Sequence, residues 1–330
     1  MRLHPFFAVA LLVPLSTSTE LLRAVLAGDT AVRATRVALD AHDPARSRVG
    51  GLVYLGGVRL SSRDPAFGGF SAMRVEGERF TLLSDSGNVV RFRMGGDWQP
   101  RDIGFADLAE GPGIGGSKLD RDSESLAVDP AGGKAWVGFE QSNTIFRYDA
   151  GLARAERWSA PKAMRDWSVN GGPEAMVRLR SGRFIAISET TRASHGNGRQ
   201  AVQFDGDPTE RPDRGFEFTY IPPAGFNPSD LTELPDGRLL VLNRRFAVPA
   251  LFTAKLVLID PRAIRPGAAV AGREIAHLAA PLLHDNFEAL AITREGTDTI
   301  VWIASDDNSQ FWERSLLLKF RLDLPRASPK

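Results

Sequence analysis

One sequence pattern recurs five times along this chain of 330 residues. Its copies read "FSAMRVEGERFTLLSDSG" from Phe70, "SESLAVDPAGGKAWVGFEQ" from Ser123, "PEAMVRLRSGRFIAISE" from Pro173, "SDLTELPDGRLLVLN" from Ser229 and "FEALAITREGTDTIVWIASDD" from Phe287. The aligned positions, Ser71, Glu124, Glu174, Asp230 and Glu288, are 53, 50, 56 and 58 residues apart. A spacing of about 50 residues restricts the fold to repeated units that pack on one another.

Each copy predicts two short apolar strands joined by a tight turn. Glycine or charged residues mark these turns at Ala131-Gly132-Gly133, Ser181-Gly182, Asp236-Gly237 and Glu295-Gly296. Third strands follow ("NTIFRYD", "RQAVQFD", "KLVLIDP", "SLLLKFRLDL"), and then less regular fourth ones ("GFEFTYIPP", "REIAHLAAP"). Four antiparallel strands per period indicate an all-β protein, a β-propeller with four-stranded blades. A β-sandwich with coincidental similarity is the alternative; no long helical period supports a parallel α/β fold.

The strand count predicts how the ring closes. The last copy supplies three strands before the chain ends, and residues 51–60 ("GLVYLGGVRL") supply one strand with no blade of its own. If these segments complete one blade, N-terminal and C-terminal strands close the ring and remove its exposed edges. We therefore expect five blades in a single domain over residues 35–325. A sixth blade built around "TRVALD" at residues 35–40 stays open.

Segments outside the repeat are predicted to be loops between blades. Residues 110–122, 190–199 and 205–214 are rich in glycine and in polar or charged residues, and loops of this kind carry function on rigid scaffolds. Residues 261–272 ("PRAIRPGAAVAG") are interpreted as a solvated connector.

The charge balance argues against a nucleic-acid partner. The chain has 41 Lys and Arg against 40 Asp and Glu, so its formal net charge is +1, and no basic run stands out. With no cysteine there can be no disulfide, thiolate chemistry or Cys-ligated zinc. Serine-hydrolase and zincin motifs are absent, and "GPGIGG" lacks the Lys-Ser/Thr ending of a phosphate loop. We expect a monomer.

The N-terminus predicts export. Arg2 precedes an apolar run from Phe6 to Leu15, and small polar residues follow, which is the pattern of a signal peptide over residues 1–28. No later segment reaches the roughly 20 apolar residues that a membrane-spanning helix needs. We therefore expect a periplasmic or secreted protein without a membrane span in its mature chain. The cleavage point is not marked by a clear motif, so an uncleaved anchor is the alternative.

Two rings of polar side chains are predicted at one mouth of the propeller. In a propeller the first strand of each blade lines the channel and the second runs antiparallel beside it, so the start of one and the end of the other lie together. The first-strand ring is Ser71, Glu124, Glu174, Asp230 and Glu288, and the second-strand ring is Asp85, Glu140, Glu189, Asn243 and Asp306.

So many carboxylates around one axis need compensation, because like charges raise one another's pKa. A hard cation, protonation of some members, or Arg and Lys partners could each supply it. Oxygen ligands without cysteine favour calcium, and magnesium less so. The alternative is structural: such acids can instead accept backbone N–H groups within their own blades.

Cationic residues near this mouth are candidate anion-binding groups. Arg192 follows the third copy, and Arg244 and Arg245 follow the fourth; arginine recognises phosphate and carboxylate groups bidentately. His195 is a candidate proton acceptor because the usual histidine pKa lies near neutrality. Lys118 and Arg121 are expected to be solvated.

The motif series "GGFSAM…LLSDSG", "SESLAV", "GGPEAM", "PSDLTELPDGRLLVLNR" and "NFEALAI" resembles the phytase-like family of exported bacterial proteins, also described as having esterase-like activity of phytase. The likeness covers roughly residues 50–322. It implies a propeller with recurrent acids and a phosphoesterase or esterase activity. Matched to the family's motifs, those acids are Asp85, Glu124, Glu174, Asp230 and Glu288. Ser71 and Asn243 depart from the acidic pattern, and the layout is similar to that of calcium-dependent propeller lactonases.

Two functions follow as hypotheses. In the first, the protein hydrolyses a small anionic ester or phosphoester. Calcium is then held by Glu124, Glu174, Asp230, Glu288 and Asp85, the proton acceptor is Glu140, Glu189 or His195, and the anion is bound by Arg192, Arg244 and Arg245. In the second, the ion is structural and the mouth only binds a partner. Sequence alone leaves open whether the protein is an enzyme.

Overall fold

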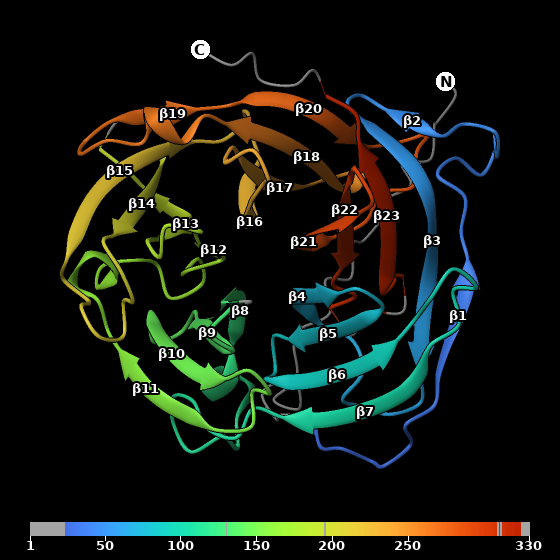
Figure 1. Ribbon diagram of the computed structural model, residues 1–330, viewed down its shortest axis with the longest axis horizontal. Helices are drawn as coiled ribbons and strands as arrows, with labels where there is room; N and C mark the ends of the chain where they lie inside the picture. The colour runs from blue at the N-terminus through green and yellow to red at the C-terminus, as the bar shows by residue number, and fades with distance from the viewer. Residues whose placement is uncertain (1–23, 130, 195, 309, 311, 325–330) are drawn as a thin grey trace, which may run out of the picture.

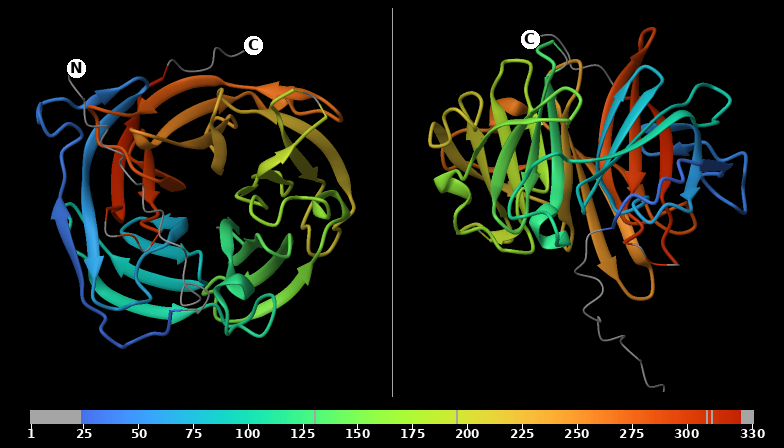
Figure 2. Two further views of the ribbon diagram at one scale, coloured as in Figure 1. Left: turned by 180° about the vertical axis from the view of Figure 1, so that it is seen from behind. Right: turned by 90° about the horizontal axis from the view of Figure 1, so that it is seen from below.

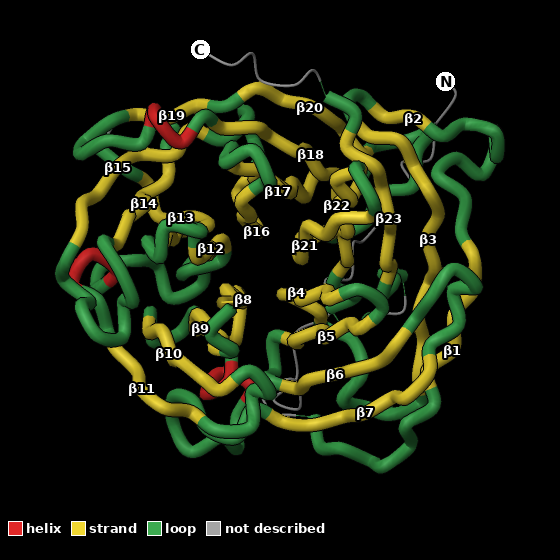
Figure 3. Tube along the Cα trace, viewed as in Figure 1, coloured by secondary structure: helices red, strands yellow, loops and turns green. Residues whose placement is uncertain are grey.

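Five antiparallel sheets stand around a central channel in the computed structural model, which describes residues 24–129, 131–194, 196–308, 310 and 312–324. The innermost strands of the five sheets surround the channel (Figure 1). The predicted β-propeller with five four-stranded blades is confirmed. Helical structure in the described residues is limited to short 3₁₀ turns outside the sheets (Figure 3), namely η2 (Lys118–Arg121), η3 (Lys162–Met164) and η4 (Pro261–Ala263).

The first four blades follow the chain order. The first contains β4 (Phe70–Glu76), β5 (Arg79–Ser84), β6 (Asn88–Arg93) and β7 (Arg101–Asp107). The second contains β8 (Ser123–Asp129), β9 (Lys134–Phe139), β10 (Thr144–Asp149) and β11 (Ala155–Ser159). The third contains β12 (Ala175–Arg178), β13 (Phe184–Arg192), β14 (Arg199–Phe204) and β15 (Gly215–Ile221). The fourth contains β16 (Asn227–Glu233), β17 (Leu239–Ala247), β18 (Leu251–Ile259) and β20 (Arg273–Leu278).

The fifth blade closes the ring with strands from both ends of the repeat region. It contains β21 (Phe287–Glu295), β22 (Asp298–Ser305), β23 (Leu316–Leu322) and β3 (Leu52–Ser62), and β3 pairs antiparallel with β23. Two further strands, β1 (Val32–Arg36) and β2 (Arg48–Val49), pair with the outer side of β3. The segment that could have begun a sixth blade therefore forms an outer edge of the fifth.

The connector at residues 261–272 differs from its interpretation. It contains β19 (Ala269–Ala271), which adds to β15 in parallel as a fifth strand of the third blade. Val270 and Ile264 are buried in that blade's core, so this segment is structural and only partly solvated. Apolar side chains spaced by an irregular loop carry no strand period, which is why the sequence pattern missed it.

Glycine makes the tight turn between the first and second strands in every blade. Positive φ angles occur at all five of these turns, where side chains other than glycine are strained: they are at Gly77, Gly133, Gly182, Gly237 and Gly296. The core is divided among the spaces between neighbouring blades. One apolar cluster, for example, joins Leu242 and Leu256 of the fourth blade to Phe287 and Ile303 of the fifth. No helix within the described segments is both long and apolar enough to cross a membrane.

Candidate functional site

The two predicted polar rings lie at the same end of the propeller and are buried. Each lies near the start of a first strand or along, or just after, the mouth-side half of a second strand, and none of the ten residues is more than 9% exposed. They are Ser71, Glu124, Glu174, Asp230 and Glu288 in the first-strand ring, and Asp85, Glu140, Glu189, Asn243 and Asp306 in the second-strand ring. Burial of so many acids requires pairing, protonation or a bound cation.

Irregular strand pairing at the start of the first strands changes the direction in which several of these side chains point. Phe70 pairs with Ser84 and Ala72 with Leu83, so Ser71 is left out of the ladder. Glu124 and Glu288 are skipped in the same way in the second and fifth blades. A bulge of this kind redirects a side chain out of the regular alternation. These three side chains of the first-strand ring therefore stand apart from the sheet at the mouth.

Five carboxylates from the second and third blades form the densest part of the site. Asp122, Glu124 and Glu140 have carboxylate oxygens within 4.8 Å of one another, as do Glu140, Glu174 and Glu189. We call these five residues the carboxylate cluster. Glu140 belongs to both groups and hydrogen-bonds to the carboxyl groups of Asp122 and Glu174. Because carboxylates this close repel one another when ionised, the arrangement favours protonation or a bound cation.

Burial and like charge favour protonation of three cluster members, Glu124, Glu140 and Glu174. Burial, then Glu174, raises the pKa of Glu124 well above its usual range. For Glu174 the causes are burial and then Glu189. Burial and Asp122 raise the pKa of Glu140 to about 8. A bound cation would reverse these effects by favouring the ionised carboxylates.

Two cations compensate acids at the edges of the cluster. Nη2 of Arg244 lies 3.0 Å from Glu189, and its Nη1 lies 3.3 Å from Glu288. On the other side, Nζ of Lys118 lies 2.5 Å from Asp85. Burial opposes the charge on both bases, but their carboxylate neighbours raise each pKa above its ordinary value. The four cluster members other than Glu189 make no ion pair with any described residue.

Three residues in or next to the site were missed or misread from the sequence. Asp122 lies two positions before Glu124, outside the strand pattern, and its carbonyl accepts the N–H of Glu140 at 2.9 Å. Lys118 was expected to be solvated, but the η2 turn, capped by Ser117, brings it onto Asp85. Arg121 was also expected to be solvated; it is buried, and its guanidinium donates to the carbonyl of Pro112. The acidic run "DRDSE" was the only available signal for Asp122.

In the fourth blade, the ring residue Asp230 is bonded to the backbone, unlike the carboxylates of the cluster. Here the ladder skips Ser229, so Asp230 stays paired with Leu242. Its two carboxylate oxygens accept the N–H groups of Leu231 at 2.7 Å and of Leu290 at 2.6 Å, which joins the fourth blade to the fifth. Asn243 accepts the Tyr220 hydroxyl at 2.9 Å. Asp230 lies outside the carboxylate cluster, and its role as a metal ligand stays a prediction.

An Asp230→Asn variant distinguishes two roles of Asp230: accepting backbone N–H groups that join the fourth and fifth blades, and binding a metal ion. Because at least one backbone N–H would face an amide NH₂, we expect the free energy of unfolding in chelator to fall by about 1–3 kcal/mol. Calcium affinity should stay unchanged. Urea unfolding and calorimetry measure the two quantities, with the exposed Asp298→Asn as control. Unchanged stability together with lost calcium affinity would instead make Asp230 a ligand.

Not all predicted anion-binding residues meet at the cluster. Arg192 is exposed at the end of β13. Arg245 packs over the Phe226 ring, with its guanidinium 5.1 Å from the ring centre, on the face of β17 opposite Arg244. His195 lies outside the described residues. Among the arginines proposed from sequence, Arg244 is the one in contact with the rings.

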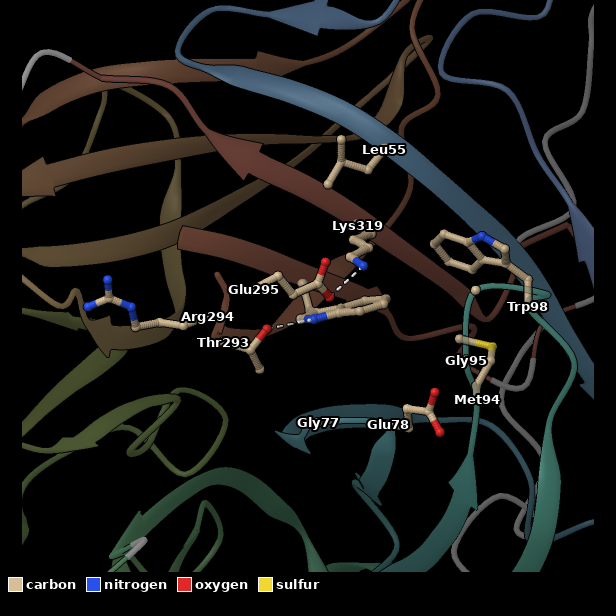
Figure 4. Close-up of a pocket in the computed structure, with 12 residues that line it drawn as sticks. Leu55, Gly77, Glu78, Met94, Gly95, Trp98, Thr293, Arg294, Glu295 and Lys319 are labelled. Carbon is tan, nitrogen blue, oxygen red and sulfur yellow. Dashed lines mark hydrogen bonds and ion pairs between the residues drawn. The ribbon is translucent and has the colours of Figure 1, made fainter. Parts of the chain in front are cut away.

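Two cavities lie away from the carboxylate cluster. The channel beyond the rings holds about 680 Å³; apolar and charged side chains both line it, and among the latter Arg178 pairs with Asp129. A cleft of about 410 Å³ lies between the first and fifth blades (Figure 4). In that cleft Glu295 pairs with Lys319 at 2.6 Å, and Thr293 accepts the indole N–H of Trp302. Four polar groups of this cleft thus already have partners within it, and the carboxylate cluster remains the candidate site.

Comparison with protein families assigns this propeller to a family. Residues 65–309 match the phytase-like family, described as "esterase-like activity of phytase". The chain belongs to the phytase-like family. The match covers the start of the first blade through the second-strand end of the fifth, and so includes both rings. A search of curated proteins finds no match.

Solved structures resemble this phytase-like propeller only distantly. A Myxococcus xanthus glutaminyl cyclase is 11% identical with a TM-score of 0.45, covering 79% of this chain and 93% of that one. A luciferin-regenerating enzyme is 10% identical with a TM-score of 0.43, covering 87% and 95%. The PQQ domain of a Coprinopsis cinerea pyranose dehydrogenase is 9% identical with a TM-score of 0.43, covering 90% and 94%. These likenesses carry no argument about substrate or mechanism.

Proposed function

We propose that this phytase-like protein is a divalent-cation-dependent hydrolase of phosphoesters or carboxylic esters, with calcium in the carboxylate cluster. One contrast carries the proposal. Four buried cluster carboxylates make no ion pair with a described residue, whereas Arg244, beside them, is already paired with Glu189 and Glu288. A cation would complete the charge balance, and the adjacent guanidinium suits an anion bound against that cation.

The residues present fit a hard cation. All the donors are carboxylate oxygens, they come from two blades, and they lie within 4.8 Å of their neighbours. Calcium accepts six to eight oxygens in loose geometry, which suits ligands held on separate blades. Asp122, Glu124, Glu140 and Glu174 would hold the ion. This set shares Glu124 and Glu174 with the ligands predicted from sequence. Glu288 and Asp85 are paired with Arg244 and Lys118 instead.

The chain's own groups would then bind and orient the ester and accept a proton. A divalent cation supplies Lewis acidity and lowers the pKa of a bound water. Water adds across the ester: its oxygen bonds to phosphorus or to the acyl carbon, the bond to the leaving oxygen breaks, and the leaving group takes up a proton. Glu189 is the proton acceptor we favour, because it is the one cluster member outside the set of carboxylates that would hold the ion. Arg244 would hold the anionic oxygens.

A hydrolysis assay tests this proposal. We expect the purified protein to hydrolyse at least one of p-nitrophenyl phosphate, bis-p-nitrophenyl phosphate and p-nitrophenyl acetate with calcium, and to lose the activity in chelator. Glu174→Gln should reduce kcat/KM by at least 100-fold, because it removes a charged ligand; Glu217→Gln, at an exposed glutamate of β15, should not.

The assay also separates hydrolysis from simple binding. Turnover that persists in chelator would contradict the metal-dependent mechanism. If no substrate turns over but calcium raises the melting temperature, the protein is a binding propeller with a structural ion. We also place the mature protein in the periplasm or outside the cell, on the strength of the N-terminal residues, which lie outside the described part of the chain.

A further inference from the structure

Exposed apolar side chains gather at the mouth that holds the carboxylate cluster. Among the described residues, ten large hydrophobic side chains are exposed, and seven of them lie on loops or hairpin ends at this mouth. These seven are Ile114, Leu119, Val169, Phe246, Val248, Leu251 and Trp312. Scattered exposed hydrophobic residues need no explanation, but Phe246, Val248 and Leu251 belong to one hairpin and together form a local apolar surface.

The hairpin of β17 and β18 joins this apolar surface to Arg244, the arginine that pairs with Glu189 of the cluster. β17 continues past the ring position Asn243 as a paired strand, and Ala247 still faces Leu251. The long hairpin extends beyond the sheets of the propeller (Figure 2). Because side chains alternate along a strand, Phe246 projects on the same face as Arg244. Arg245, between them, packs on Phe226 on the opposite face.

Phe246 forms an aromatic pair at the tip of the hairpin. It faces Phe252 across the ladder, and their ring centres are 5.1 Å apart. Phe246 is nevertheless 60% exposed, so the pair presents an aromatic surface to solvent. Phe246 is two residues after Arg244 on β17, and the guanidinium of Arg244 contacts Glu189 and Glu288.

Cations at the mouth limit how much negative charge a ligand can carry. Lys118 and Arg244 pair with ring carboxylates, and Arg199 donates to the backbone carbonyl of Glu189, so each of these cations is already engaged. A substrate with many phosphates would therefore meet more carboxylates than cations. One anionic group, placed between a bound cation and Arg244, fits better, and the rest of the molecule would meet apolar side chains.

We propose that the substrate is an ester with a single anionic or reactive head group and an apolar or aromatic substituent, which packs on the Phe246 and Phe252 pair. This inference rests on the proposed function, since it assigns the head group to the cluster and Arg244. Phe246 is then a specificity-determining residue: it contacts the substituent and takes no part in bond breaking.

Binding of two phosphonates tests the proposal without requiring turnover. Benzylphosphonate and methylphosphonate share a non-hydrolysable head group and differ in the aromatic substituent. By calorimetry in calcium, we expect benzylphosphonate to bind at least 10-fold more tightly. Phe246→Ser should bring the ratio of the two dissociation constants near 1, while methylphosphonate binding stays unchanged. The control is Trp158→Ser, at an aromatic residue 59% exposed on the outer strand β11 and stacked on Phe146.

Each outcome decides something. Equal affinities for the two phosphonates in the unmodified protein, or a preference that survives in Phe246→Ser, would overturn the proposal. So would failure to bind either phosphonate. If the benzyl preference is present but no ester is hydrolysed, the hydrolase function fails and the aromatic binding surface stands. If esters are hydrolysed without that preference, the hydrolase stands and the substrate class is wrong.

Discussion

Arg244→Ala is expected to destabilise the protein by about 3 kcal/mol in chelator at pH 7.5, because it leaves Glu189 and Glu288 without their shared cation. The side chain is only 23% exposed, so water replaces the guanidinium poorly. Urea unfolding measures the loss. Arg192→Ala, at an exposed arginine on the neighbouring hairpin, should change the free energy of unfolding by no more than about 0.5 kcal/mol.

A second substitution, at Glu288, tests why Arg244→Ala loses stability. If the uncompensated charge of Glu288 accounts for the loss, Glu288→Gln should recover part of it in the Arg244→Ala background while destabilising the unmodified protein. Additive effects of the two substitutions would show that Arg244 acts through packing alone. Equal stability of Arg244→Ala and Arg192→Ala would remove Arg244 from the charge balance of the mouth altogether.

The ring of blades could be predicted because every blade repeats the same physical requirements. The turn between first and second strands needs a positive φ angle, and glycine stands there in each copy. The unpaired strand at residues 51–60 required a partner, and β23 supplies it. Segments without a repeat gave less information. β1 and β19 are single edge strands, so neither had a second copy against which its pattern could be recognised.

The candidate site could be predicted as far as strand positions determine it. All ten ring residues are buried at one mouth, as the antiparallel order of first and second strands requires. The division of those acids into a cation-paired part and an unpaired part could not be foreseen. It depends on Lys118, which sits on a 3₁₀ turn, and on which direction Arg244 takes from β17. Loop conformation and side-chain reach leave no periodic trace in a sequence.

Raising the pH from 6 to 8.5 in chelator is expected to lower the melting temperature, and calcium should reverse the change. Glu124, Glu140 and Glu174 have raised pKa values in the folded protein, so these groups bind more protons in the folded state than in the unfolded chain above about pH 4.5. Where the folded state holds more protons, stability falls as pH rises. For Glu140 this loss is complete only above its pKa of about 8.

Calcium binding and proton release should therefore be coupled. The ion needs ionised carboxylates, so its affinity should rise between pH 6 and 8.5, and calorimetry in two buffers of different ionisation enthalpy should detect released protons. The shift in melting temperature on adding calcium should likewise be larger at pH 8.5 than at pH 6. A melting temperature independent of pH in chelator, with no proton release, would show that the cluster is ionised without a cation and is not a calcium site.

Glu174→Gln is the decisive variant for this coupling. An amide resembles the protonated acid but cannot ionise, so the variant should be more stable than the unmodified protein in chelator at pH 8.5, where like charges meet in the unmodified cluster. It should gain little stability from calcium, because one charged ligand is missing. A residue that served only the blade would give the opposite pattern: lower stability in chelator at every pH, with the calcium response retained. Thermal unfolding of both proteins at pH 6 and 8.5, with and without calcium, separates the two.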